Sequence, residues 1–324
     1  MTGTRASGPS TEARLERVDP NDVTELNAVF ADSFTERYRR DGMVGVRVPQ
    51  LNPAIWRYAI EDAGEGAMQW RNERGEIVAF NISHQSGSEG WMGPLAVRPD
   101  AQGRGLGKRI VNAGTAWLQS RGVRVIGLET MPRTMDNIGF YSGLGFVPQR
   151  LTITLTLEAS PSDDATSLLG RLHAASRDDV LAQCARLTSA CSPGVDFTRE
   201  IAVTAELGLG DTALLWQQGR LAGFALFHTA PLVEGRSRDE LRVLKLVLAD
   251  ESNITALATM LRSVARRTGT RRVAIRVQGE YPAAYAALVA AGGRVRWTDL
   301  RMALPVAGDA DSERRGMVLS NWEI

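Results

Sequence analysis

The chain has 324 residues, of which 44% are hydrophobic, and this length suits two domains of about 150 residues each with substantial cores. Its formal net charge of +1 gives no reason to expect nucleic acid or a membrane surface as a general partner. The three histidines are scattered, without the spacing of metal ligands, so we expect no metal cofactor.

The N-terminal segment, the apolar runs and the cysteines indicate where in the cell the protein is expected. Residues 1–12 are small and polar, without an apolar signal core, and predict a disordered lead-in. No apolar run reaches the length of a transmembrane helix. If Cys184 and Cys191 share one helix, their seven-residue spacing puts them about 10 Å apart, too far for a disulfide. We therefore predict a cytoplasmic protein with two buried thiols.

In the first half of the chain, apolar residues recur every two residues in some segments and every three to four in others. This pattern predicts strands that alternate with helices. Asp19 and Pro20 mark the start of a helix, and Glu73-Arg74-Gly75 marks the turn of a hairpin. The predicted strands lie at 14–18, 67–71, 76–83, 91–97, 123–129 and 147–157. The predicted helices cover 23–34, 53–60, 110–118 and the surroundings of Tyr141.

A glycine-rich turn lies between the strand 91–97 and the next helix. Gly103, Gly105 and Gly107 alternate with other residues, which lets several backbone N–H groups point at one spot beside a helix N-terminus. Such a place suits a phosphate or pyrophosphate. It is not a P-loop, because Arg109 follows Gly107-Lys108 where a Ser or Thr is required. It is not a dinucleotide fingerprint, because the glycines are each two apart.

The loop Gln102-Gly103-Arg104-Gly105-Leu106-Gly107 fits the pattern Gln/Arg-x-x-Gly-x-Gly/Ala. It resembles the coenzyme A pyrophosphate loop of the GNAT superfamily of acyl-CoA-dependent N-acetyltransferases. About thirty residues further on, the segment 134–146 carries Phe140-Tyr141 and ends in Leu144-Gly145-Phe146, which is similar to a second GNAT signature. The resemblance implies an α/β (α+β) fold, a mixed, mainly antiparallel twisted sheet flanked by helices.

Beyond a polar linker at 160–165 the same order of elements recurs, which predicts a diverged duplication. We expect a catalytic domain at 13–159, a degenerate GNAT-like domain at 166–304 and a tail at 305–324. The predicted strands of the second copy lie at 212–216, 221–228, 241–248, 273–277 and 297–304, and its helices at 181–187, 197–207, 254–267 and 282–290.

The second copy has lost the phosphate loop. Its corresponding turn, residues 249–253, has no glycine or arginine, and Asp250 and Glu251 would repel a pyrophosphate. These two acids suit the N-terminus of the following helix, which they can cap in place of a ligand. We therefore predict one coenzyme site per chain.

The resemblance also implies roles for residues. Backbone groups of the loop hold the pyrophosphate, and the strand before it holds the pantetheine arm and polarises the thioester carbonyl. Tyr141 matches a tyrosine that protonates the leaving sulfur; the alternative is a core tyrosine beside Phe140. Either Thr134 or Asn137 contacts the coenzyme, and we include Asn137 in the expected set. The expected coenzyme-binding residues are Leu95, Ala96, Val97, Gln102, Gly103, Arg104, Gly105, Leu106, Gly107, Lys108, Asn137 and Tyr141.

The general base is the open point, because the strand 91–96 offers no carboxylate. Glu129, at the end of the next strand, is the first candidate and Glu89 is the second. His84 and a water-mediated route are further alternatives.

The sequence thus predicts direct transfer of an acetyl group from acetyl-CoA to a primary amine of a small molecule or peptide. The alternatives are transfer of a longer acyl group, thioester chemistry without an amine, and a non-catalytic acyl-CoA-binding regulator. We expect residues 33–45, 49–56 and 84–90 to set the acceptor, with Tyr38, Trp56 and Trp91 as apolar contacts. The acceptor and the oligomeric state stay open.

The tail ends in an unusual way for a terminus. Residues 316–324 contain five large apolar side chains, distributed over both alternating faces. This pattern predicts a buried strand that joins a sheet edge near the domain junction and buries Trp322. The alternative is a coil packed on its own domain.

Overall fold

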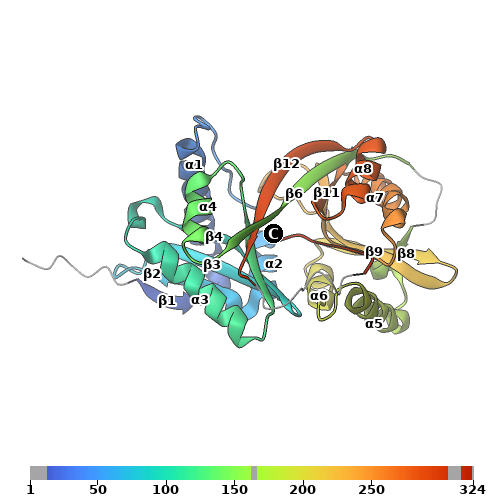
Figure 1. The fold of residues 1–324 in the computed structure, drawn as a ribbon, viewed down its shortest axis with the longest axis horizontal. Helices are drawn as coiled ribbons and strands as arrows, with labels where there is room; N and C mark the ends of the chain where they lie inside the picture. The colour runs from blue at the N-terminus through green and yellow to red at the C-terminus, as the bar shows by residue number, and fades with distance from the viewer. Residues whose placement is uncertain (1–12, 162–165, 306–314, 323–324) are drawn as a thin grey trace, which may run out of the picture.

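The computed structural model describes residues 13–161, 166–305 and 315–322. The described strands form one continuous 13-stranded sheet in the order β1-β2-β3-β4-β5-β12-β6-β11-β10-β9-β8-β7, with β13 paired to β10. Among the described pairs, β4 with β5 and β10 with β11 are parallel and the others are antiparallel. This is the mixed, mainly antiparallel α/β fold that was predicted, and Figure 1 shows helices on both sides of the sheet.

The first half contributes a sheet covered on both faces. Its strands are β1 (Arg14–Arg17), β2 (Ala67–Arg71), β3 (Ile77–Ser86), β4 (Glu89–Val97) and β5 (Val125–Thr130). Its helices are α1 (Val23–Arg40), α2 (Pro53–Ala63), α3 (Leu106–Ser120) and α4 (Met135–Ser142). Trp56 of α2 packs between Phe30 of α1 and Phe80 of β3 in one core, whereas α3 places Ile110 in a separate core with Met92. The predicted elements all form, with ends shifted by a few residues.

The second half repeats this arrangement. Its strands are β7 (Ser167–Leu168), β8 (Gly210–Gln217), β9 (Arg220–His228), β10 (Glu240–Leu248) and β11 (Arg272–Gln278). Its helices are α5 (Ala174–Cys191), α6 (Thr198–Glu206), α7 (Ile254–Thr268) and α8 (Pro282–Ala290). α5 begins seven residues before the predicted start, and β7 was not predicted. Cys184 and Cys191 both lie on α5 as buried free thiols.

The two halves exchange their last strands. β6 (Val147–Glu158), from the first half of the chain, pairs with β11 over its C-terminal part, from Glu158 opposite Arg272 to Thr152 opposite Gln278. β12 (Arg294–Ala303), from the second half, pairs with β5. Leu155 and Leu157 of β6 therefore lie in the core of the second half, and Met302 of β12 lies in that of the first. Figure 1 shows β6 and β12 crossing side by side between the halves.

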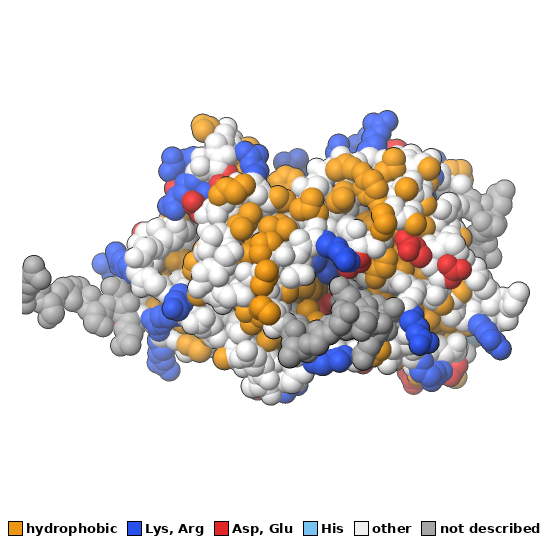
Figure 2. Space-filling model, in the orientation of Figure 1, with side chains coloured by type: hydrophobic (Ala, Val, Ile, Leu, Met, Phe, Trp, Pro, Cys, Tyr) orange, Lys and Arg blue, Asp and Glu red, His pale blue; other side chains and the backbone are white. Residues whose placement is uncertain are grey.

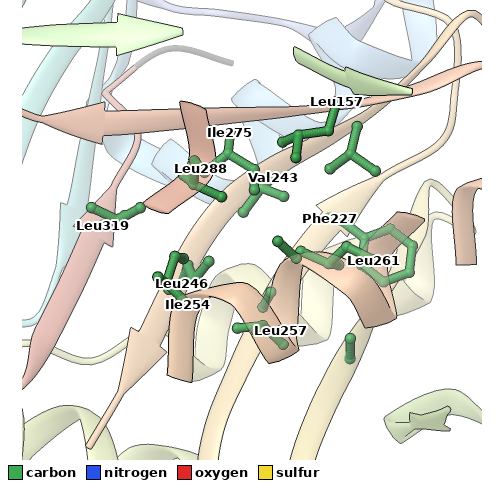
Figure 3. Close-up of a cluster of buried hydrophobic side chains, with 14 of the residues drawn as sticks. Leu157, Phe227, Val243, Leu246, Ile254, Leu257, Leu261, Ile275, Leu288 and Leu319 are labelled. Atoms are coloured by element: carbon green, nitrogen blue, oxygen red, sulfur yellow. The ribbon is translucent and has the colours of Figure 1, made fainter. Parts of the chain in front are cut away.

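The tail forms β13 (Met317–Ser320), which pairs antiparallel with Lys245–Leu248 of β10. The parallel pairing of β10 with β11 ends at Arg242 and Ala274, so β13 occupies the opening where those strands diverge. We expected a sheet edge, and the tail instead fills a gap inside the sheet. Figure 3 shows Leu319 among the buried side chains of the second half, and Trp322 is 4% exposed.

We predict that Leu319→Ala lowers the free energy of unfolding by about 2–5 kcal/mol, because it empties a packed position in this core. Leu15→Ala is the matched control, since Leu15 is 49% exposed and should change stability by less than about 0.5 kcal/mol. Chemical denaturation of both variants measures the difference. Equal stability of the two variants would show that the tail contributes little to the core.

Candidate active site

The divergence of β4 from β5 opens a pocket of about 500 Å³. The two strands pair from Glu89 to Met92 of β4, and past that point Leu95, Ala96 and Val97 line the opening. Gln102 donates a hydrogen bond from its side chain to the Val97 carbonyl at 2.9 Å, which ties the loop to the strand. The predicted pantetheine-binding strand thus borders a real cavity.

The glycine-rich loop closes one end of this pocket. Gly103 and Gly105 have φ angles of +77° and +78°, and a Cβ atom at either position would meet open space. Gly105 is the residue before α3, so the first N–H groups of that helix are free to bind an anion at its positive end. Gly107 and Lys108 line the same pocket. This end is therefore suited to a pyrophosphate.

Two expected loop residues turn their side chains elsewhere. Leu106 is buried in the core under α3, and Arg104 lines a neighbouring hollow of about 370 Å³ together with Arg74, Arg98 and Arg109. Their backbone groups still belong to the loop. A ligand in the main pocket would meet Lys108 as the cation of the loop.

α4 places Tyr141 where this pocket meets a second one. The Tyr141 hydroxyl has no hydrogen-bond partner among the described residues, and burial raises the pKa of the phenol. Asn137 lines both pockets and Phe140 lines the first. Thr134 is buried and donates to Asp41 at 2.9 Å, so the structure brings Asn137 rather than Thr134 to the cavity.

The second pocket, of about 340 Å³, lies beyond Tyr141 and has walls from both halves of the chain. We call it the acceptor pocket. The exchanged strand β12 contributes Trp297 and Asp299, and the tail contributes Trp322. Figure 2 shows hydrophobic side chains gathered on the surface over the middle of the molecule, where β6 and β12 cross. The other lining residues are Phe30, Phe34, Arg37, Tyr38, Val48, Leu51, Met92, Gly93, Pro94, Leu95, Leu128, Glu129, Thr130, Met131, Asn137, Tyr141 and Leu232.

Glu129 lies on the wall of the acceptor pocket in an ion-pair cluster. It accepts hydrogen bonds from Arg276 at 2.5 Å, Arg301 at 2.9 Å and Thr152 at 2.5 Å. Burial alone would raise the pKa of Glu129, but the charges of Arg276 and Arg301 outweigh it and lower that pKa. These contacts favour the carboxylate and leave it a weak base.

Asp299 shares this cluster, although no motif in the sequence predicts it there. Its Oδ2 accepts from Arg276 at 3.0 Å and its Oδ1 accepts from the Trp297 indole at 3.1 Å. Burial raises the pKa of Asp299, and the charge of Glu129 raises it further, against the opposing effect of Arg276. Asp299 belongs to the second half of the chain, so no local motif near the loop could have pointed to it.

The other candidates for a base lie outside both pockets. Glu89 is buried, accepts a hydrogen bond from Ser320 and lines neither pocket. His84 is fully buried, with Nδ1 2.5 Å from Asp62 and its ring stacked on Trp91. Trp91 and Trp56 are core residues, so Tyr38 is the member of the expected aromatic set that reaches the acceptor pocket.

The corresponding turn of the second half is closed. Asp250 accepts from the Ser252 N–H at 2.9 Å, and Glu251 accepts from the Ala284 N–H at 2.7 Å at the start of α8. β13 fills the opening between β10 and β11, which matches the opening between β4 and β5 of the first half. Protein groups thus take the places that a ligand would need.

The described residues lack two other kinds of functional feature. They contain no group of three or more His, Cys, Asp or Glu side chains placed to hold a metal ion. None of their helices combines the length and the apolar character needed to cross a bilayer.

Residues 29–146 match the family model for the acetyltransferase (GNAT) family. No curated protein sequence matches the chain. A GCN5-related N-acetyltransferase from Sphaerobacter thermophilus is similar in structure, with a TM-score of 0.59 and 16% identity over 95% of this chain and 98% of its own. A tandem GNAT protein from the clavulanic acid biosynthesis pathway has a TM-score of 0.57 and 14% identity over 93% and 100%. The N-myristoyltransferase of Saccharomyces cerevisiae, solved with myristoyl-CoA, has a TM-score of 0.63 and 9% identity over 99% and 82%. At such identities the likeness is one of fold.

We predict that Gly105→Asp abolishes coenzyme binding, because it adds a negative side chain where the pyrophosphate is expected. Gly122→Asp is the matched control: it follows the same helix, has a φ of +72° and also faces open space. Both changes carry similar backbone strain, so their melting temperatures should fall alike. Calorimetric titration with acetyl-CoA should show binding to Gly122→Asp alone. Unchanged affinity in Gly105→Asp would refute the loop assignment.

We also predict a stoichiometry of one acetyl-CoA per chain, because β13 and the acidic turn close the second opening. The same titration of the parent chain measures it, and Gly105→Asp should then leave no residual site. Two sites per chain, or a second site that survives in Gly105→Asp, would contradict the prediction.

Proposed function

We propose that this chain, in which residues 29–146 match the model of the acetyltransferase (GNAT) family, moves an acetyl group from acetyl-CoA to a primary amine by direct attack. The observation that supports this best is the meeting of the two pockets at Tyr141. A thioester in the first pocket and an amine in the second would react beside one free phenol. The two cysteines lie away from this place on α5, so they offer no covalent relay.

The first pocket binds and orients the coenzyme. The N-terminus of α3 and Lys108 hold the pyrophosphate, and the pantetheine arm runs along Leu95 to Val97. An N–H group of this strand polarises the thioester carbonyl, as an oxyanion hole does. Asn137 completes the wall beside the reacting end. The rigid sheet and helix thus orient the thioester toward the acceptor pocket.

Tyr141 is proposed to protonate the leaving thiolate. A phenol has an ordinary pKa of about 10, and burial raises that pKa here, so the group carries its proton at neutral pH. A thiolate that departs next to it can take this proton.

Glu129 as the general base stays a prediction. Its position on the acceptor pocket supports that role, and its two guanidinium partners oppose it by lowering its pKa. Deprotonation through water is the alternative that the sequence leaves open.

Transfer of a longer acyl group is the second candidate function. It is favoured by the apolar lining of the acceptor pocket and by the structural neighbour that holds myristoyl-CoA. We keep acetyl as the first choice because the matching family is one of acetyltransferases. The proposal also keeps the catalytic domain at 13–159, the degenerate one at 166–304, a cytoplasmic location, and an amine rather than a nucleic acid as partner.

We predict that Tyr141→Phe lowers kcat by about 10²–10⁴-fold, because it removes the proton donor and little else. Its affinity for acetyl-CoA should stay unchanged. Tyr285→Phe, on the corresponding helix α8 of the second half, is the control and should keep full activity. Thiol release from acetyl-CoA across an amine library measures turnover. Normal coenzyme binding by the parent chain with no turnover on any amine would instead identify a non-catalytic regulator.

A further inference from the structure

The acceptor pocket has mainly apolar walls and a few charged groups. Its walls are mainly aromatic and aliphatic, with Trp297 and Trp322 on the side that the second half supplies. Arg37, the cation of this lining, is already paired with Asp41 at 2.5 Å and Asp136 at 3.1 Å. The described lining therefore offers no unpaired cation for a carboxylate group of an acceptor. Burying such groups against these walls would cost their hydration without replacing it.

The two carboxylates of the lining, Glu129 and Asp299, differ in the number of cations that bind them. Arg276 and Arg301 both bind Glu129, whereas Arg276 alone among the described cations binds Asp299. The second carboxylate oxygen of Asp299 accepts only the neutral indole N–H of Trp297 among the contacts described. Asp299 thus keeps an oxygen that no described cation engages, on the wall of the pocket.

We infer that the acceptor is a primary amine on an apolar body, and that Asp299 is the carboxylate that binds its ammonium group and takes its proton. This rests on the proposed acetyl transfer. The apolar body would lie against Trp297 and Trp322, and the ammonium would supply a second cation to Asp299. The exchanged strand β12 thereby brings in a catalytic residue from the other half of the chain.

The step balances in protons and bonds. One proton of the ammonium passes to Asp299, and the free amine forms a bond to the thioester carbonyl carbon. The bond from carbon to sulfur then breaks, and Tyr141 donates its proton to the sulfur. Tyr141 regains a proton from the nitrogen, which has become an amide, and Asp299 releases its own to water.

The charged groups around Asp299 fit this role. Arg276 faces it from β11 and Glu129 faces it from β5, while Arg301 of β12 binds Glu129 from the other side. Across the pocket lie Arg37, in its own ion pairs, and the neutral Tyr141. Burial and the nearby Glu129 charge raise the pKa of Asp299, which makes it the stronger base of the two carboxylates.

A panel of amines tests the substrate class on the parent chain. Hexylamine and 1,6-diaminohexane have the same body, and only the second carries another charge at its far end. 2-Phenylethylamine and L-phenylalanine differ by one carboxylate. We expect the first member of each pair to have a kcat/KM at least about 10-fold higher. Equal or reversed preference in both pairs would overturn the substrate class, as would better turnover of long-chain acyl-CoA with polar amines.

The variant Asp299→Asn tests the residue. We expect kcat/KM to fall by about 10²–10⁴-fold. In the parent chain, kcat/KM should decline at acidic pH with an apparent pKa above the ordinary range for aspartate, and the variant should lack this decline. Asp299→Glu should restore part of the activity and the decline of kcat/KM at acidic pH. Asp250→Asn, in the closed turn of the second half, should keep the parent profile. An unchanged decline of kcat/KM at acidic pH in a folded Asp299→Asn would overturn the assignment.

The outcomes separate the two proposals. If no amine reacts although acetyl-CoA binds through the loop, the proposed function itself fails. If amines react without apolar preference or without dependence on Asp299, only the present inference fails. The amine panel uses the parent chain, so it decides the substrate class even where Asp299→Asn does not fold.

Discussion

The exchange of β6 and β12 is the constraint on which the rest of the structure depends. Each strand completes the sheet of the other half, so the two halves cannot separate without breaking both sheets. The exchange also sets Arg301 of β12 opposite Glu129 of β5, and it brings Asp299 into the cluster in which Arg276 binds both carboxylates. The pocket beside the glycine-rich loop is thus lined by one half, while the acceptor pocket is lined by both.

A buried polar network holds the tail at this junction. Lys245 donates from Nζ to Ser320 at 2.9 Å and to the Asn321 carbonyl at 3.1 Å, and it lies over the rings of Trp91 and Phe197. Glu89 accepts a hydrogen bond from Ser320. A buried ammonium is costly unless it is paired and hydrogen-bonded, and the tail supplies those bonds. The tail therefore stabilises the junction as well as the core of the second half.

The parts of this structure that local chemistry encodes could be predicted from the sequence. The loop glycines need positive φ, Asn52 and Asp250 cap helices, and Gln218-Gly219 turns a hairpin, and each of these signals lies within a few residues. The exchange could not be predicted, because β6 and β12 have strand patterns that suit either partner. Asp299 could not be predicted for the same reason: its role depends on which sheet its strand joins.

The exchanged strand has a consequence for how the protein is made. The chain between Thr130, where β5 ends, and Arg294, where β12 begins, takes roughly 10–30 s to translate at typical rates. During that time β5 lacks its outer neighbour and its edge is open to other chains. The nascent chain would thus hold its glycine-rich loop long before β12 supplies its wall of the acceptor pocket.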